Sequence, residues 1–351
     1  MIIYNQKLNA YNFLTDFINT NKYSSIVILC DTNTKKYCLN NLYDEININP
    51  DIINVIEIND GEQVKTIETS KYIWDKLLEI GCDRKSLLIN LGGGVVSDIG
   101  GFVASVFKRG ISFINIPTTL LSMVDAGIGG KTGVDFGGVK NIIGTITLPK
   151  MTIIDIRYLE TLNERETVNG YAEILKHALI KDKNHWEDLL NCDPFNLNYS
   201  QIIHSINIKQ KIVEEDINEQ GIRKILNFGH SIGHAIEAFF LKGNKNSIIK
   251  HGEAVAAGMI MESYISMQLG LLNSNDFEEI KDNIIKIYGL IEIKSSTFHN
   301  ILEFLINDKK NRNNIFYFVL LDGIGNATFN VEVKNPLVLD ALGYYSKLNI
   351  N

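Results

Sequence analysis

The chain has 351 residues, of which 45% are hydrophobic, so it is long enough and apolar enough for two domains with a sizeable core. Its formal net charge of -7 and its scattered lysines argue against nucleic acid or an anionic membrane as the main partner. Polar residues interrupt every long apolar run, and the N-terminus lacks a signal-peptide pattern, so no membrane anchor is expected. Four cysteines without C-x-x-C spacing indicate reduced thiols in a cytoplasmic protein.

The first half of the chain alternates short apolar runs with helical patterns. Strands are expected at residues 25–31, 55–58, 86–91, 113–117 and 151–156, and helices at 66–80 and 99–107. Apolar runs of this length between turn residues are typical of buried parallel strands. The alternation predicts an α/β, Rossmann-like domain with right-handed crossovers.

A run of three glycines, Gly92–Gly94, follows the third of these strands and leads towards Asp98. Glycines let backbone N–H groups approach a phosphate, and a following helix N-terminus favours its negative charge. The spacing is not the G-x-G-x-x-G of a standard dinucleotide site, so a tight strand-to-helix turn is an equally good interpretation. Asp60 and Glu62 follow the preceding strand, where carboxylates can bind ribose hydroxyls or simply face solvent.

The segment 117–133 is rich in glycine and also carries Asp125 and Lys131. This composition predicts irregular backbone close to a ligand. The sequence Gly129–Thr132 lacks the upstream glycine of a P-loop, so a Walker A assignment is rejected. Lys140 and Asn141 extend the cationic, glycine-flanked surface, where lysines can hold a phosphate or a carboxylate.

The second half is helical. Helices are expected at 165–180, 202–215 and 252–270, and residues 315–321 form a short strand or a buried segment. The predicted domains are therefore 1–158, an α/β nucleotide-binding domain, and 159–351, an all-α domain. A ligand site is expected in a cleft between them.

Two histidines, His230 and His234, are one helical turn apart, so their imidazoles project from one face. His251 follows in a second segment, and Glu173 lies upstream, three residues before Lys176. A carboxylate with two or three imidazoles suits a catalytic divalent metal such as zinc, although histidines four apart are more often ordinary surface residues. Spacing alone leaves His234 and His177 open as ligands.

Taken together, the motifs resemble the 3-dehydroquinate synthase family, within the sugar phosphate cyclase superfamily. The resemblance spans nearly the whole chain and rests on motifs that occur in the family's order: Gly92–Asp98, Arg109–Gly110, Pro117–Leu121, Val124–Gly133, Lys140–Asn141, Gly170–Lys176, Asn227–His234 and His251–Val255. It implies NAD in the first domain, and zinc or cobalt in the second.

The resemblance also implies residue roles. The metal ligands would be Glu173, His230 and His251. Substrate would be surrounded by Asp125, Lys131, Asn141, Lys176, Lys209, Arg223, Asn227, His234 and a lysine of the pair Lys309 and Lys310, with Arg109 supplied across a homodimer interface. NAD would contact Asp60, Gly61, Glu62, Lys65, Gly94, Val95, Val96, Ser97, Asp98, Thr118, Thr119, Lys131, Lys140, Tyr158, Leu159, Glu160 and Thr161.

The implied activity is a phosphate-eliminating carbon–oxygen lyase of the shikimate pathway, which leads to chorismate and the aromatic amino acids. It would convert 3-deoxy-D-arabino-heptulosonate 7-phosphate to 3-dehydroquinate and phosphate. The steps would be transient oxidation by NAD, β-elimination, re-reduction and intramolecular aldol closure.

Two departures from the family pattern are Ser97, where glycine is frequent, and a longer segment 241–250 before His251. The nearest alternative is another sugar phosphate cyclase, such as a 2-deoxy-scyllo-inosose synthase, and a more distant one is a metal-dependent polyol dehydrogenase. Arg223 and Asn227 favour the first activity, because a carboxylate-bearing substrate needs such partners.

Overall fold

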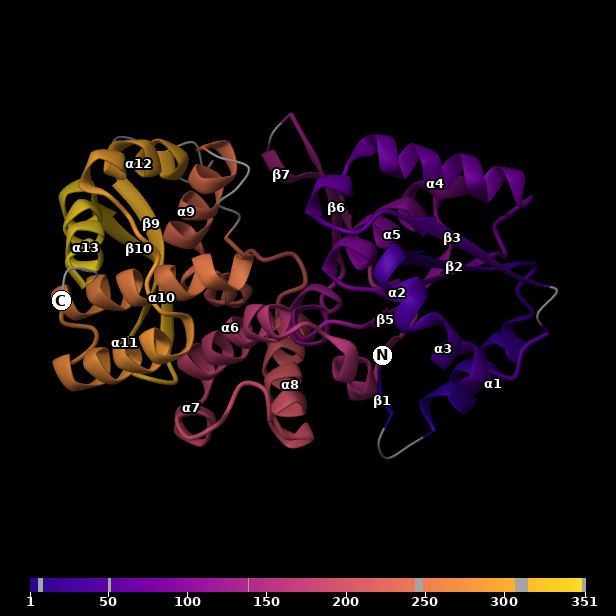
Figure 1. The fold of residues 1–351 in the computed structure, drawn as a ribbon, viewed down its shortest axis with the longest axis horizontal. Helices are drawn as coiled ribbons and strands as arrows, with labels where there is room; N and C mark the ends of the chain where they lie inside the picture. Colours follow the sequence, from indigo (N-terminus) through magenta and orange to yellow (C-terminus); the bar gives the residue numbers. More distant parts are fainter. Residues whose placement is uncertain (6–8, 50–51, 138, 244–248, 307–314, 349–351) are drawn as a thin grey trace. The chain divides into compact units, whose positions relative to one another are not determined.

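The computed structural model describes residues 1–5, 9–49, 52–137, 139–243, 249–306 and 315–348 (Figure 1). The chain forms two compact units, Met1–Thr167 and Val168–Asn351. The sequence-based boundary between residues 158 and 159 falls in the 3-10 segment Ile156–Thr161, just before this division. Among the described residues, no helix is both long enough and apolar enough to cross a membrane.

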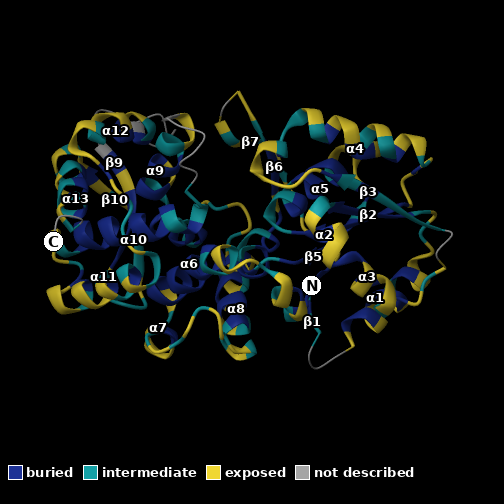
Figure 2. Cartoon of the chain, in the orientation of Figure 1, coloured by how far each residue is buried: buried dark blue, intermediate teal, exposed yellow. Residues whose placement is uncertain are grey.

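Unit 1 is built on a six-stranded sheet in which every pairing is parallel. The strand order is β1-β8-β5-β4-β2-β3. The strands are β1 (Ile2–Tyr4), β2 (Ile26–Asp31), β3 (Ile53–Ile58), β4 (Leu87–Gly92), β5 (Ser112–Pro117) and β8 (Thr152–Ile154). The central strand β4 is buried along its whole length, as expected for a parallel strand covered on both faces. Its neighbours β2 and β5, labelled in Figure 2, are buried at all but one residue each.

The strand order reverses between β2 and β4, because β3 extends the sheet on one side and β5 on the other. In open α/β sheets, ligands bind outside the carboxyl ends of the strands at such a switch point. The helices of this unit are α1 (Ala10–Asn21), α2 (Thr32–Tyr37), α3 (Leu39–Glu45), α4 (Ile67–Glu79) and α5 (Gly94–Val106). The Rossmann-like α/β fold expected for this half is confirmed.

A two-stranded antiparallel ribbon, β6 (Lys131–Phe136) and β7 (Val139–Ile146), was not expected. The prediction of irregular backbone up to residue 133 is correct for Gly129 and Gly130, which have φ of 96° and 69°, but wrong from Lys131 on. Gly133 pairs with Gly144, and a Cβ on Gly144 would lie 2.0 Å from the carbonyl oxygen of Thr132. These glycines therefore permit a close approach of two strands.

Unit 2 is helical. Its helices are α6 (Glu164–Lys181, which begins in unit 1), α7 (Lys183–Leu189), α8 (Tyr199–Glu215), α9 (His230–Gly243), α10 (His251–Gln268), α11 (Ser274–Tyr288), α12 (Phe298–Ile306) and α13 (Asn335–Leu348). An antiparallel pair, β9 (Ile315–Leu321) and β10 (Ala327–Lys334), amends the expectation of an entirely α-helical domain. The strict alternation of apolar and polar residues in 327–334 was the signal for β10.

Helices α9 and α10 pack with their backbones in contact. A Cβ on Gly258 of α10 would lie 2.0 Å from the carbonyl oxygen of Gly229, and a Cβ on Gly233 would lie 2.9 Å from that of Ala254. The sequence therefore needs glycine at these positions for packing. The result is that the start of α9, with His230 and His234, lies along the first half of α10, which begins at His251.

Candidate functional site

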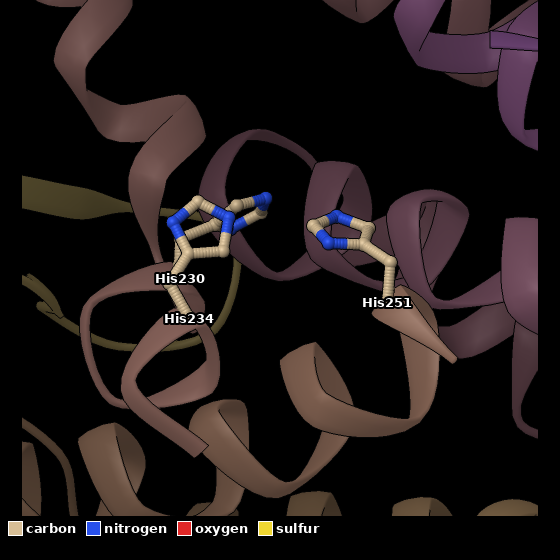
Figure 3. A group of neighbouring side chains, drawn as sticks. All are labelled: His230, His234 and His251. Atoms are coloured by element: carbon tan, nitrogen blue, oxygen red, sulfur yellow. The ribbon is translucent and has the colours of Figure 1, made fainter. Parts of the chain in front are cut away.

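Three imidazoles gather at the starts of α9 and α10 in unit 2 (Figure 3). The ring centroid of His230 lies 5.1 Å from that of His234 and 5.4 Å from that of His251, and the centroids of His234 and His251 are 5.5 Å apart. One ring nitrogen of each histidine lies within 4.8 Å of the others. This spacing is compatible with a shared metal ion.

Glu173 of α6 faces two of these rings from the interior. Its side chain is fully buried, and its Oε1 lies 3.4 Å from His230 Nε2 and 3.6 Å from His251 Nε2. Oε1 accepts no hydrogen bond from any described residue. Two ligand atoms about 2.1 Å from a tetrahedral zinc ion lie about 3.4 Å apart. The distance from the buried oxygen to each of the two nitrogens is therefore that between ligands of one metal ion.

The second nitrogen of each ring is held by an outer partner. His230 Nδ1 lies 2.9 Å from the carbonyl oxygen of Phe228, and His251 Nδ1 lies 3.4 Å from Glu237 Oε2. Such partners fix the ring orientation and the tautomer of a metal-binding histidine. Both Nε2 atoms are thereby left facing Glu173.

The charges of the cluster favour an ionised carboxylate. Burial opposes ionisation of Glu173, but the Lys176 ammonium, which pairs with its Oε2, and His230 hold the pKa of this carboxyl well below its usual value. Burial also opposes the charged form of His251, yet the carboxylates of Glu173 and Glu237 raise the pKa of that ring to about 10. A buried carboxylate of this kind is a strong attractor for a cation.

The two ligands that spacing left open differ in their surroundings. His234 is exposed and belongs to the histidine group, so distance permits it as a ligand. His177 is buried on α6, and its Nδ1 lies 2.7 Å from Ser205 Oγ. The structure therefore brings His234, but not His177, into the histidine group.

The other expected substrate residues of unit 2 occupy α6, α8 and the segment before α9. Lys176 and Lys209 are buried, as is Arg223, whose Nη1 donates to the carbonyl oxygen of Ile217 at 2.6 Å. Asn227 Nδ2 donates to Glu219 Oε1 at 2.7 Å. Lys309 and Lys310 lie outside the described residues, as do residues 244–248 of the segment before His251.

In unit 1, the glycine run lies at the carboxyl end of β4. Gly93 is the N-cap of α5, and no side chain caps this helix. A Cβ on Gly93 would lie 3.1 Å from Thr119 Cγ2, and one on Gly94 would lie 3.2 Å from Ala126 Cβ. Helix α5 begins at Gly94, so the expected helix start at Ile99 is wrong. Only Gly92 and Gly93 precede the helix and form the turn. The N–H groups of its first turn suit a phosphate.

A buried ion pair lies beside this turn. Lys65 Nζ contacts Asp98 Oδ2 at 2.5 Å, and both side chains are largely buried. Burial raises the pKa of Asp98 to about 6, although Lys65 opposes the shift. Nearby, Lys140 Nζ lies 3.4 Å from Glu62 Oε1, and Asp60 Oδ1 accepts from Thr32 Oγ1 at 2.8 Å. Polar groups for a nucleotide thus line the ends of β3 and β4.

The remaining expected cofactor residues vary in exposure. Thr118 and Ser97 are buried, and neither hydroxyl has a hydrogen-bond partner among the described residues. The hydroxyl of Tyr158 is 3.2 Å from that of Tyr11, inside the unit, while Glu160 and Thr161 are exposed. Gly61, after β3, has a φ of 98°. Val95 and Val96 belong to the first turn of α5. Leu159 is partly buried in the same 3-10 segment as Tyr158.

Three of the four expected substrate residues of unit 1 lie on irregular or strained backbone. Asp125 belongs to a π-helical turn, Ser122–Ala126, and Lys131 is exposed at the start of β6. Asn141 has a φ of 52°, and its N–H donates to Asp135 Oδ1 at 2.8 Å. Arg109 is exposed with a φ of 67°. Positive φ at residues other than glycine is a form of strain that clusters at functional sites.

Sequence reasoning missed three buried polar residues next to the histidines. Glu237 is seven residues after His230, on the same face of α9, and this spacing was an available signal. Asn169 Oδ1 accepts from the N–H of Gly252 at 2.6 Å, and Glu262 accepts from two N–H groups at the start of α9. The contacts of Asn169 and Glu262 join segments that are far apart in sequence, so no local pattern predicts them.

Comparison with solved structures defines a class. The 2-epi-5-epi-valiolone synthase ValA from Streptomyces hygroscopicus, with NAD+ and Zn2+ bound, matches with a TM-score of 0.84 and 26% identity, over 99% of this chain and 97% of that one. A 2-deoxy-scyllo-inosose synthase complexed with carbaglucose-6-phosphate, NAD+ and Co2+ also matches with a TM-score of 0.84, at 24% identity, over 97% and 95%. The fold is that of the sugar phosphate cyclases.

The sequence comparisons narrow this class to one family. The family models "3-dehydroquinate synthase N-terminal" and "3-dehydroquinate synthase C-terminal" match residues 55–169 and 170–311. The 3-dehydroquinate synthase of Parabacteroides distasonis is 40% identical over 337 residues, covering 95% of this chain and 94% of that protein. That of Thermodesulfovibrio yellowstonii is 44% identical over 291 residues, covering 80% and 79%. The chain belongs to the 3-dehydroquinate synthase family.

Proposed function

We propose that this chain converts 3-deoxy-D-arabino-heptulosonate 7-phosphate to 3-dehydroquinate and phosphate, as a carbon–oxygen lyase of the shikimate pathway. The observation that carries the proposal is Glu173 Oε1, a buried oxygen without a hydrogen bond among the described residues, between His230 Nε2 and His251 Nε2. A chain of this family with such a cluster has the ligands for a catalytic metal. Membership of the family supplies the substrate.

Glu173, His230 and His251 would hold zinc or cobalt. Such an ion acts as a Lewis acid towards hydroxyl and carbonyl oxygens of a substrate. The choice of Glu173 over His234 as third ligand is supported by burial: Glu173 is fully enclosed and outer partners turn both histidines towards it, whereas His234 is exposed. His234 then stays available to position substrate or move a proton.

NAD would bind at the carboxyl ends of β3 and β4. It supplies reversible hydride transfer and is regenerated in each turnover. The first turn of α5 presents Gly94, Val95, Val96 and Ser97 to the pyrophosphate, and Asp60 and Glu62 present carboxylates to ribose hydroxyls. The Lys65–Asp98 pair fixes the helix start beside them. The family-implied contacts of Thr118, Thr119, Lys131, Lys140 and residues 158–161 are part of the same proposal.

The substrate carries a phosphate and a carboxylate, which call for cationic and amide partners. Lys176, Lys209, Arg223 and Asn227 of unit 2 supply them, and Arg suits a planar carboxylate in particular. The ordered hydrogen bonds of Arg223 and Asn227 hold these groups in place before substrate arrives. Asp125, Lys131 and Asn141 are the corresponding residues of unit 1.

We also propose a cytoplasmic homodimer. All four cysteines are free thiols, in keeping with a reducing compartment. The segment 136–148 exposes a group of large apolar side chains, a pattern that suits an interface with a second copy: Phe136, Val139, Ile142, Ile146 and Leu148. Arg109 would be the residue shared across it. Analytical ultracentrifugation of the wild type and of Val139→Asp tests this: the dimer should give way to monomer, and an unchanged dimer contradicts this choice of surface.

A substrate panel tests the reaction. The protein, supplied with NAD and zinc or cobalt, is mixed in turn with 3-deoxy-D-arabino-heptulosonate 7-phosphate, glucose 6-phosphate and a simple polyol, and phosphate release is followed. Release from the first substrate alone, lost in His230→Ala, supports the proposal. Release from glucose 6-phosphate instead would make the chain an inosose synthase, and NADH formed from the polyol would make it a dehydrogenase.

A further inference from the structure

Helix α9, which carries His230 and His234, begins without a capping side chain of its own. The residue before it is Gly229, whose φ is 77° and whose added Cβ would lie 2.5 Å from Met259 Cγ. A Ser, Thr, Asp or Asn normally accepts hydrogen bonds from the first N–H groups of a helix. The packing of α9 against α10 excludes such a residue at this point.

The missing acceptor comes from α10. Glu262 is fully buried; its Oε2 accepts from the N–H of Gly229 at 2.6 Å and its Oε1 from the N–H of Ile232 at 3.0 Å. Both carboxylate oxygens therefore bind the first turn of α9, from a residue 33 and 30 positions away in sequence. The positive end of a helix dipole favours an oxygen acceptor at this point.

His230 is the first residue of α9 and lies between these two donors. Its Nδ1 lies 2.9 Å from the carbonyl oxygen of Phe228, on the chain segment that Glu262 also holds through Gly229. The position of its Nε2, 3.4 Å from Glu173 Oε1, is thus set by the backbone at 228–232. A shift of this turn would move the ligand atom away from Glu173.

We propose that Glu262 is a positioning residue of the metal centre, which acts by fixing the first turn of α9 and with it His230. The proposal rests on the proposed function, since it takes His230 as a metal ligand. Glu262 touches neither substrate nor metal in this account. Loss of an outer partner of a metal ligand typically lowers metal affinity by about 10–100-fold.

The test uses the isosteric variant Glu262→Gln, which places an NH2 group against an N–H donor, and Glu262→Asp, which keeps the carboxyl group and shortens the reach. The matched control is Ser266→Ala, one turn further along α10. Ser266 is equally buried; its Oγ accepts from the N–H of Leu321 of β9 and donates to the backbone carbonyl of Glu262. Its loss therefore removes two buried hydrogen bonds but leaves the Glu262 side chain and its contacts with α9 in place.

Zinc and cobalt affinity are measured by chelator competition, and the visible spectrum of the cobalt-loaded protein reports ligand geometry. The expected result is about 10–100-fold weaker binding and a changed cobalt spectrum for Glu262→Gln, with Ser266→Ala close to wild type even if its melting temperature falls. Equal affinities for Glu262→Gln and wild type, with only a lower melting temperature, would overturn the proposal and leave Glu262 a stabilising residue.

Amide hydrogen exchange of the metal-free protein separates this inference from the proposed function. Slow exchange at Gly229 and Ile232 in the wild type, accelerated in Glu262→Gln or Glu262→Asp, is expected. Fast exchange of these amides in the wild type would refute the role of Glu262 even if neither variant folds. Failure of the wild type to bind zinc or cobalt would instead refute the metal ligands themselves.

Discussion

Replacing Glu173 by Gln should remove most of the metal affinity while the fold persists. The side chain keeps its shape but loses the charge that faces His230 and His251, whose Nε2 atoms lie 3.4 and 3.6 Å from Oε1. Structural zinc sites bind with about 10–16 kcal/mol over four ligands, so one ligand is worth roughly 3 kcal/mol. At 1.4 kcal/mol per tenfold, this is about a 100-fold loss.

The assay is chelator competition on the metal-free protein, with circular dichroism as a check that the helices remain. Glu237→Gln, which alters the outer partner of His251, should lower the metal affinity by less than Glu173→Gln does. Glu187→Gln, which removes a charge from the exposed face of α7, should leave the metal affinity unchanged. Wild-type zinc affinity in Glu173→Gln, together with its loss in His234→Ala, would refute the reasoning and assign the site to the three histidines.

Three further predictions follow from other features of the structure. His234→Ala should retain the metal and lower kcat by about 10²–10⁴-fold, as for loss of a proton-transfer group; metal content and steady-state kinetics check this. Gly258→Ala should lower the free energy of unfolding by about 1–3 kcal/mol or more, because its Cβ would lie 2.0 Å from the carbonyl oxygen of Gly229; urea unfolding measures it, and an unchanged midpoint would contradict the packing. Because burial raises the pKa of Asp98 to about 6, its ionised form costs stability above that pH, so the wild type should gain stability relative to Asp98→Asn as pH falls from 7 to 4; parallel curves in urea unfolding would contradict the shift.

The parallel sheet could be read from the sequence because each strand is a continuous apolar run. The run ending at Asp31 and the run ending at Leu91 became β2 and β4, with bounds within a residue of those expected. Their burial on both faces leaves a signal that needs no knowledge of their neighbours. The amphipathic pattern at 165–180 likewise became α6, because one helical face packs into the core.

The β6–β7 ribbon and the start of α5 could not be read in this way. Glycine signals both a ligand-binding turn and a close approach of backbones, and only tertiary contacts separate the two. Gly144 lies against Thr132 across the ribbon, whereas Gly93 and Gly94 lie at the end of β4. For the same reason, the sequence did not predict that Gly94–Asp98 is helical.

The candidate metal site was partly predictable. The spacing of His230 and His234 predicted that both lie on one helical face. The family resemblance, and not the spacing, indicated Glu173 and His251 as metal ligands. The supporting contacts of Asn169 and Glu262 were not predictable, because they join residues 30 or more positions apart in sequence. The Glu262 contact depends on how closely α9 packs on α10, and the Asn169 contact on how closely α6 packs on α10, which local patterns do not encode.

The most direct test of the account is the number of turnovers per NAD. The protein is incubated with zinc or cobalt, a large excess of 3-deoxy-D-arabino-heptulosonate 7-phosphate and far less NAD than substrate, while phosphate, 3-dehydroquinate and absorbance at the NADH band are recorded. An internal redox cycle should give many equivalents of phosphate and 3-dehydroquinate for each NAD, with no accumulation of NADH. Phosphate release that stops at one equivalent per NAD, with NADH appearing in parallel, would contradict an internal redox cycle and with it the proposed function.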